Sequence, residues 1–211
     1  ALKLAPLINA EIVSCDSMQV YKGIDIATSK PTIEERKFIK HHLLDVISPE
    51  EEYSVADYRR DALRAIEEIL SKGKVSLIVG GSGLYFKALL DGIFSGPSKD
   101  LDLRKKLYKE AEEKGKIFLY EKLKTIDPAI TQKIHSNDLR RMVRALEVYY
   151  LTGMPISMLQ KKTDGLSSTY NKIIYGLIRP RNELYARINE RVEKMFSEGI
   201  ICVSKSLMDS M

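Results

Sequence analysis

The residues best suited to chemistry form a polar run that begins where a short apolar segment ends. Ile12 and Val13 are typical of a buried strand, and Asp16 and Ser17 follow shortly after them. In an open α/β sheet, ligands bind beside the carboxyl ends of the strands. A carboxylate there can accept a proton, hold a metal ion or bond a substrate amine. The alternative is that Asp16 or Ser17 caps the next helix.

A glycine-rich turn offers a second polar group at the same edge of the expected sheet. Residues 75–79 are a continuous apolar run, followed by the turn 80–83 and a helical pattern over 84–90. This order indicates a βαβ unit, so we expect Ser82 to lie close to Asp16. Backbone amides and a hydroxyl at a helix N-terminus suit an anion or a polarised substrate atom. A plain tight turn, with Ser82 as the helix cap, is the alternative.

A cluster of arginines forms a third candidate site. Arg140 and Arg144 are four residues apart in a helical pattern and share one face, with Arg141 beside them. The planar guanidinium group suits contacts with phosphate. The alternative is an ordinary solvated cluster, in which we expect Glu147 to be the acid that pairs with it.

The positive charge of the chain is concentrated in one segment. Residues 96–165 hold 15 Lys and Arg against 10 Asp and Glu, an excess equal to the whole net charge of +5. A solvated helical face is the ordinary explanation of a charge run. A local excess in an otherwise balanced chain instead indicates a polyanionic partner.

Length and composition fit a globular protein of the cytoplasm. The 211 residues, 44% hydrophobic and 30% charged, can form one domain with a sizeable insertion. The only cysteines, Cys15 and Cys202, make no disulfide framework. We find no apolar run near the roughly 20 residues of a membrane span and no signal peptide. Nothing indicates an obligate dimer, so a monomer is expected.

The remaining patterns predict an α/β core interrupted by an all-helical insertion. The core takes residues 1–95 and 166–211, and the insertion takes residues 96–165, closed by Asp164-Gly165. Ser54 and Asp57 form a capping box that opens a helix through Ser71. The other expected elements are a helix ending within 1–9, a helix from Pro31 through Lys40, insertion helices over 101–115, 118–126 and 137–152, a strand over 170–178 and a helix over 183–197.

Both ends of the sequence fall inside helical patterns. Residues 1–9 lack a start signal, and residues 203–208 lack a stop signal. We therefore expect the sequence to be a piece, or the ordered portion, of a longer chain.

Taken together, these motifs resemble the tRNA dimethylallyltransferase (isopentenyltransferase) family. Their order and spacing match over essentially the whole chain, so the set is specific, although no single stretch would suffice. The matching stretches are Asp16 to Gly23, Asp25-Ile26, Thr28 to Pro31, His41 to Asp45, Tyr53 to Tyr58, Gly80 to Tyr85 and His135 to Glu147.

The resemblance implies a P-loop-NTPase-like parallel sheet with a helical insertion that holds the tRNA anticodon stem-loop. It implies transfer of a dimethylallyl group from its pyrophosphate to the exocyclic amine of the adenine next to the anticodon, with Mg²⁺ nearby. Asp16 would be the general base. Ser82 stands where the family usually has threonine, and keeps the hydroxyl. The implied tRNA contacts are Asp16, Ser17, Met18, Gln19, Ser82, Arg104, Arg140, Arg141, Met142, Val143 and Arg144.

The sequence departs from the family pattern at both ends. The nucleotide-type phosphate-binding loop, G-x-x-x-x-G-K-S/T, is expected just before Ala1, and a further basic segment is expected after Met211. Without them we expect the 211 residues alone to be inactive or nearly so. The alternatives are a prenyltransferase for free adenine nucleotides, a small-molecule P-loop kinase with lid arginines, and an RNA-binding module that uses no donor.

Overall fold

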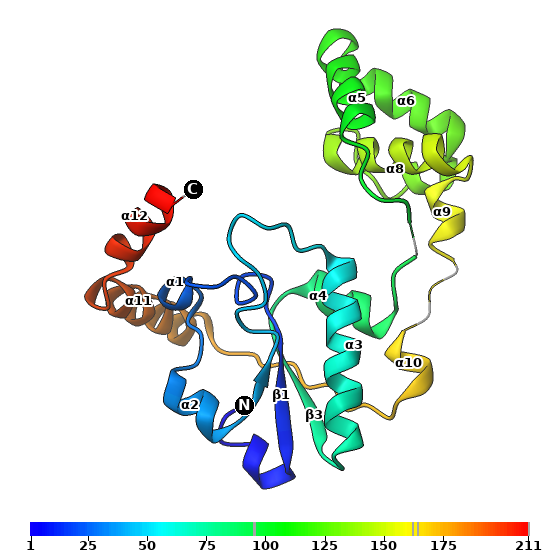
Figure 1. Cartoon of the computed structure of the whole chain (residues 1–211). Coiled ribbons are helices and arrows are strands. Elements are labelled where there is room, and N and C mark those ends of the chain that lie inside the picture. The colour runs from blue at the N-terminus through cyan, green and yellow to red at the C-terminus, as the bar shows by residue number, and fades with distance from the viewer. Residues whose placement is uncertain (95, 162, 164, 211) are drawn as a thin grey trace. The chain divides into compact units, whose positions relative to one another are not determined.

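The chain folds into two compact units, seen in the computed structural model of Figure 1. One unit takes residues 1–91 and 165–211, and the other takes residues 92–164. The structure describes residues 1–94, 96–161, 163 and 165–210. The predicted closing pair Asp164-Gly165 therefore lies partly outside the described residues.

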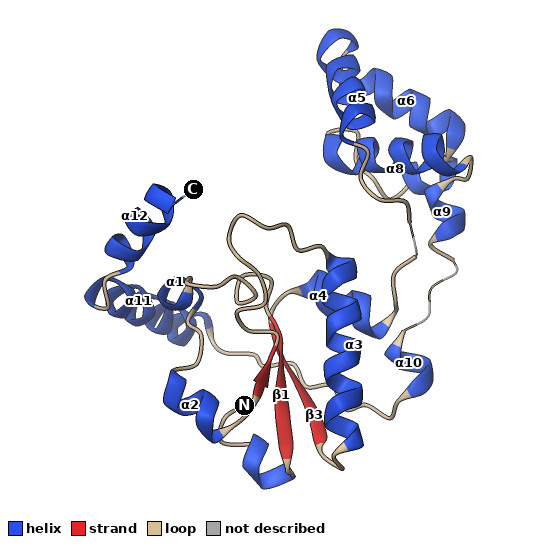
Figure 2. Ribbon diagram, viewed as in Figure 1, coloured by secondary structure: helices blue, strands red, loops and turns tan. Residues whose placement is uncertain are grey.

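A three-stranded parallel sheet forms the centre of the first unit (Figure 2). The strands are β1 (Ala10–Cys15), β2 (His41–His42) and β3 (Val75–Gly80), in the order β2-β1-β3. The register of β1 and β3 runs from Ala10 opposite Val75 to Cys15 opposite Gly80. The prediction of a parallel α/β sheet is confirmed, and the two-residue strand β2 was not predicted.

The two faces of β1 pack against different layers because successive side chains of a strand alternate. Val13 and Cys15 join a core with helices α3 (Val55–Ser71) and α4 (Gly83–Leu90). Ala10 and Ile12 pack on the other face against Ala5 and Ile39. Every residue of β1 is buried, as expected for the middle strand of a covered parallel sheet.

Two capping boxes begin the helices beside the sheet. The Ser54 hydroxyl accepts the Asp57 N–H and the Asp57 carboxylate accepts the Ser54 N–H, so the predicted start of α3 is confirmed. Helix α2 (Ile33–Phe38) opens in the same way with Thr32 and Glu35. The predicted helix from Pro31 through Lys40 is therefore too long at both ends.

The first unit also contains short or terminal helices. The expected helix end within 1–9 is only a 3-10 turn, η1 (Ala5–Ile8), which stops at Asn9 with φ 49°. The prediction for 183–197 is confirmed by α11 (Arg181–Ser197). The others are α1 (Asp25–Thr28), α10 (Leu166–Thr169) and α12 (Ile200–Ser210).

The strand predicted over 170–178 is wrong. The structure has extended, irregular chain there, with Ile173 80% and Leu177 97% exposed. A strand exists only when a neighbouring strand accepts and donates its backbone hydrogen bonds, and none of the described strands pairs with this segment. The β-branched and aromatic residues of this segment favour a strand, but that preference alone does not form one without a neighbouring strand.

The second unit consists of helices around one apolar core. They are α5 (Leu101–Lys114), α6 (Lys116–Ile126), α7 (Pro128–Thr131), α8 (Leu139–Thr152) and α9 (Ile156–Leu159). Helices α5, α6 and α8 bury Leu107, Leu119 and Leu146 in the same cluster. The predicted helices are thus confirmed, while α7 and α9 are additional. Within the described residues, no helix combines the length and apolar character that crossing a membrane requires.

Candidate functional site

The carboxyl ends of β1 and β3 approach each other so closely that only glycine fits at one position. A Cβ atom added to Gly80 would lie 2.1 Å from the carbonyl oxygen of Cys15. That oxygen also accepts a hydrogen bond from the backbone N–H of Ser82, at 3.1 Å. The missing side chain at residue 80 therefore lets the glycine turn close onto the end of β1.

The Ser82 hydroxyl faces the polar run that follows β1. It accepts the backbone N–H of Ser17 at 2.9 Å and lies 3.2 Å from the Ser17 hydroxyl. Ser82 occupies the N-cap position of α4, but its side chain makes no capping hydrogen bond there. The alternative of a simple helix cap thus does not account for this hydroxyl.

Asp16 lies at the same edge, next to the Ser17–Ser82 contact. Its Oδ1 atom accepts the backbone N–H of Met18 at 2.8 Å, which holds the carboxylate in a tight turn. The carboxylate caps no helix, because the next helix begins only at Asp25. The structure brings Asp16 and Ser82 to one edge, with the hydrogen bonds to Ser82 made by Ser17 rather than by Asp16.

Gln19 fixes the path of the polar run. Its side-chain oxygen accepts the Ser14 hydroxyl at 2.9 Å, and its nitrogen donates to the Thr28 carbonyl at 3.1 Å. Both ends of the amide are thus committed to protein groups. Met18, by contrast, is 50% exposed and available to a ligand.

Lys30 holds the loop after β1 in place, a role that the sequence did not reveal. Its side chain is completely buried, and its Nζ atom donates to Asp25 at 2.8 Å and to Asp45 at 2.6 Å. Nζ also donates to the carbonyl of Tyr21. Burial by itself raises the pKa of Asp45, but Lys30 and Arg36 together hold that pKa below its usual value. The only signal in the sequence was that Lys30 belongs to one of the matching stretches.

Cys15 is excluded as a nucleophile by its surroundings. The side chain is fully buried, and burial raises the pKa of the thiol to about 11. The core beside it contains Tyr58 stacked on Tyr85, with ring centroids 3.8 Å apart. Since the thiolate is the reactive form, Cys15 is a packing residue under the site.

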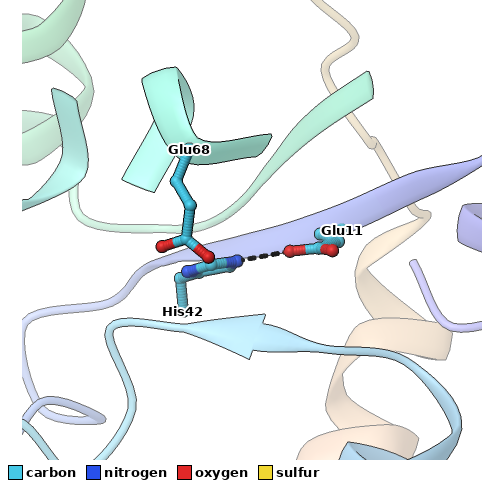
Figure 3. Close-up of side chains that lie close together, drawn as sticks. All are labelled: Glu11, His42 and Glu68. Atoms are coloured by element: carbon cyan, nitrogen blue, oxygen red, sulfur yellow. Dashed lines mark hydrogen bonds and ion pairs between the residues drawn. The ribbon is translucent and has the colours of Figure 1, made fainter. Parts of the chain in front are cut away.

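A second charged cluster lies toward the amino end of β1. Figure 3 shows the His42 ring between Glu11 and Glu68, with its Nε2 atom 2.7 Å from Glu11. These three side chains carry ligand atoms close enough together for a metal ion. The carboxylates are, however, already paired with lysines: Lys74 with Glu11, and both Lys40 and Lys72 with Glu68. A cation would have to displace ammonium groups, so we assign the cluster a structural role.

Hydrogen bonds from the lysine and histidine side chains stabilise the charged form of Glu11. The side chain is 4% exposed, and burial by itself would raise its pKa. The bonds from Lys74 and His42 outweigh that effect and lower the pKa to about 2. The cluster thereby ties β1, β2 and α3 together.

In the helical unit, the predicted arginine cluster divides into exposed and partly buried members. Arg140 and Arg141 are exposed on the first turn of α8, and Arg141 lies 3.4 Å from Asp138. Met142 and Val143 follow Arg141 on α8, and their contact with tRNA, which the resemblance implies, stays a prediction. Both are 1% exposed or less, because they face the apolar core of the unit.

Arg104 and Arg144 share one buried partner. Glu147, which is completely buried, accepts two hydrogen bonds from Arg104 and one from Arg144. The structure thus brings together two arginines that are 40 positions apart in the sequence, on α5 and α8. Both arginines lie in the helical unit, within the segment 96–165 that carries the excess of positive charge.

Comparison with known proteins identifies the family. The family model described as IPP transferase matches residues 19–211. A tRNA dimethylallyltransferase of Acetivibrio thermocellus is 45% identical over 210 residues, which cover 99% of this chain and 67% of that protein. One from Carboxydothermus hydrogenoformans is 48% identical over 208 residues, covering 98% and 67%.

Solved structures agree with the sequence comparison. The full-length tRNA isopentenylpyrophosphate transferase of Bacillus halodurans matches with a TM-score of 0.64 and 40% identity, covering 99% of this chain and 65% of that one. A eukaryotic dimethylallyltransferase described as acting on tRNA matches with a TM-score of 0.79 and 31% identity. The match covers 99% of this chain and 52% of that one. The fold is therefore one that solved prenyltransferases share. The chain belongs to the IPP transferase family and spans about two thirds of the length of its bacterial relatives.

Proposed function

We propose that this protein transfers a dimethylallyl group from dimethylallyl pyrophosphate to the exocyclic amine of the adenine next to the anticodon in tRNA. The observation that carries the proposal is the polar edge of the sheet. There the Ser82 hydroxyl accepts the Ser17 N–H at 2.9 Å, beside the carboxylate of Asp16. Membership in the IPP transferase family supports the same reaction.

The proposed step forms one bond and breaks another. The adenine amine attacks the first carbon of the dimethylallyl group, a C–N bond forms, and the C–O bond to pyrophosphate breaks with the electron pair leaving on oxygen. The amine is a poor nucleophile because its lone pair is delocalised into the ring. Asp16 orients the amine and takes its proton. The bond from Met18 to Oδ1 fixes the carboxylate in position for this transfer.

The helical unit is proposed to bind the stem-loop. The target base has to leave its stack to reach Asp16, which costs a few kcal/mol and least for a loop base. Contacts between phosphates and exposed cations such as Arg140 and Arg141 can offset this cost. Binding to tRNA should therefore weaken as salt concentration rises.

Mg²⁺ is proposed as the cofactor. Mg²⁺ prefers oxygen ligands and is commonly held by carboxylates together with substrate phosphates. The hydroxyls of Ser17 and Ser82 offer oxygens at this edge that, together with the phosphates of the donor, fit the ion, and Asp16 stays free to take the proton. When bound it would neutralise charge on the departing pyrophosphate. We further propose that the protein binds nucleotide-type phosphates, as P-loop proteins do, and works as a monomer in the cytoplasm.

A transfer assay with matched donors and acceptors tests the proposal. The protein, expressed at the length that its gene encodes, is incubated with Mg²⁺, labelled dimethylallyl pyrophosphate and an anticodon stem-loop containing the target adenine. We expect label on the stem-loop and none on a stem-loop with guanine at that position.

Three results would contradict the proposal and favour another activity. Label on free adenosine monophosphate in preference to the stem-loop would identify a nucleotide prenyltransferase. Use of ATP as a phosphoryl donor to a small molecule would identify a kinase. Salt-sensitive stem-loop binding without transfer would identify an RNA-binding module.

A further inference from the structure

Glu147 is a completely buried carboxylate whose partners come from two helices. Its Oε1 atom accepts the Asp100 N–H at 2.9 Å and the Arg104 Nε–H at 2.8 Å. Its Oε2 atom accepts Arg104 Nη2 at 2.8 Å and Arg144 Nη1 at 2.6 Å. Four donors therefore converge on one side chain, at the point where α5 begins beside α8.

The arginines that Glu147 holds are open to solvent on their other side. The side chains of Arg104 and Arg144 are 27% and 33% exposed, while that of Glu147 is 0% exposed. The carboxylate thus lies beneath the two guanidinium groups. The two guanidinium groups share one carboxylate beneath them and each keeps part of its surface exposed.

The surrounding backbone favours this arrangement. Nη2 of Arg144 also donates to the carbonyl of Pro97, at 3.1 Å. A Cβ atom at Gly96 would lie 3.1 Å from that same nitrogen and 2.5 Å from the ring of Phe94. The Arg144 guanidinium is therefore fixed by the buried carboxylate on one edge and by the chain entering α5 on another.

We propose that Glu147 is a positioning residue for RNA binding, which fixes Arg104 and Arg144 as a preformed pair of guanidinium groups for tRNA phosphates. The inference rests on the proposed function and adds to it a residue that does not itself touch RNA. A free arginine loses side-chain freedom when it binds a phosphate, whereas a guanidinium already held in place loses little. Glu147 thus lowers the entropic cost of the contact.

The test compares two buried carboxylates of the same unit. In Glu147→Gln, whichever way the amide turns, an NH₂ group faces donors that the carboxylate accepted. The control is Asp127→Asn: Asp127 is 2% exposed, and among the described residues its carboxylate accepts the backbone N–H groups of Ile130 and Ser157. Each variant replaces one buried carboxylate by an amide, but only Glu147 accepts hydrogen bonds from these two arginines.

Binding of an anticodon stem-loop and the kinetics of transfer are measured below the melting temperature of each variant. For Glu147→Gln we expect the Kd and the KM for the stem-loop to rise about tenfold, from two weakened charge-assisted contacts. The slope of log K against log salt should become shallower by about 1. The kcat at saturating stem-loop and the KM for the donor should stay within about twofold. Asp127→Asn should keep wild-type RNA binding.

A double-variant cycle separates positioning from a general structural role. If Glu147 acts through the arginines, adding Glu147→Gln to the pair Arg104→Gln and Arg144→Gln should leave RNA binding unchanged. If Glu147→Gln does not fold, Arg104→Lys with Arg144→Lys takes its place. These lysines keep the positive charge but lack the planar guanidinium group that can donate two parallel hydrogen bonds. A fivefold or larger rise in the Kd for the stem-loop supports the proposal.

The proposal is overturned if Glu147→Gln binds the stem-loop as the wild type does, or if Asp127→Asn weakens binding equally. It is also overturned if Glu147→Gln weakens binding further in the background that lacks both arginines, or if the lysine pair binds normally. Failure of the proposed function is distinct, because the wild-type protein itself would then neither bind the stem-loop nor transfer the group to it.

Discussion

The two units of the molecule each bury a glutamate, and they use it differently. In the α/β unit, Glu11 is paired with lysines and a histidine toward the amino end of β1, while the candidate chemistry lies at the carboxyl end. In the helical unit, Glu147 lies directly under two arginines of the proposed RNA surface. The first carboxylate supports the scaffold, and the second supports the site itself.

The two units therefore position their candidate functional groups by different means. The polar edge of the sheet depends on backbone closeness, as at Gly80, and on short hydrogen bonds around Asp16 and Ser82. The helical unit depends on long cationic side chains, which need a buried anion to be fixed. Variants in the first unit should change the chemistry or the stability, and those in the second should change RNA affinity.

The largest expected effect is on the chemical step. Asp16→Asn keeps an oxygen that can accept the Met18 N–H but removes the proton acceptor, so kcat should fall about 10³-fold, near 4 kcal/mol in activation free energy. The Kd for the stem-loop should change by less than about threefold. Single-turnover transfer and filter binding measure the two quantities. Asp91→Asn, which changes an exposed carboxylate after α4, is the control. A variant that retains a tenth of the wild-type rate would exclude Asp16 as the base.

The next effect concerns the backbone closeness of the sheet edge. Gly80→Ala forces a methyl group to within 2.1 Å of the Cys15 carbonyl, so the strands have to separate. We expect the free energy of unfolding to fall by about 3 kcal/mol, at the upper end of overpacking effects. In Gly81→Ala nothing lies within 4 Å of the added atom, so the free energy of unfolding should fall by less than about 1 kcal/mol. Urea unfolding of the pair measures the difference, and equal stabilities would refute the close approach.

A smaller effect should appear as a dependence of stability on pH. The pKa of Glu11 is lowered to about 2, so its contribution is fully present above its unfolded pKa near 4.5 and is lost as the pH falls toward 2. Glu11→Gln should be less stable at pH 7 by roughly 2 kcal/mol, and the difference from wild type should shrink between pH 4.5 and 2. Thermal unfolding across this range tests it, with exposed Glu34→Gln as control. A difference that does not vary with pH would contradict the assignment.

The smallest effect should be on RNA affinity from one exposed arginine. Arg140→Gln removes a single phosphate contact, so the Kd for the stem-loop should rise about fivefold and the salt slope should fall by about 0.7. Neither kcat nor the free energy of unfolding should change measurably. Lys37→Gln removes the same charge from an exposed position on α2 and serves as control. If the control weakens binding as much, the effect is one of net charge and not of this surface.

Local signals predicted much of the fold. Helix α3 was predicted with its start and end because the signals are local: the capping box of Ser54 and Asp57 opens it, and Gly73, with φ 69°, follows its end. The strand over 170–178 was wrong because strand formation depends on a partner elsewhere in the chain. The strand β2 was missed for the same reason, since its two residues become a strand only by pairing with β1.

The site was predicted by residue type and less well by role. The glycine turn and the polar run were expected at one sheet edge, and the contact between Ser17 and Ser82 joins them. The partners of Lys30 and Arg104 could not be read from the sequence, because Asp45 and Glu147 are brought to them by the fold. Met142 and Val143 were named as tRNA contacts through the resemblance alone, and the sequence motif did not reveal that the turn of the helix directs their side chains into the core.

The pairing of β1 with β3 also has a consequence for the rate of folding. Ala10 pairs with Val75, so the sheet forms only after a long intervening chain has closed into a loop. The contacts among α5, α6 and α8 join segments much nearer in sequence. Because loop closure opposes distant pairing, we expect the helical unit to reach its native packing earlier than the sheet does. The unit proposed to bind RNA would then be in place while the proposed catalytic edge is still being assembled.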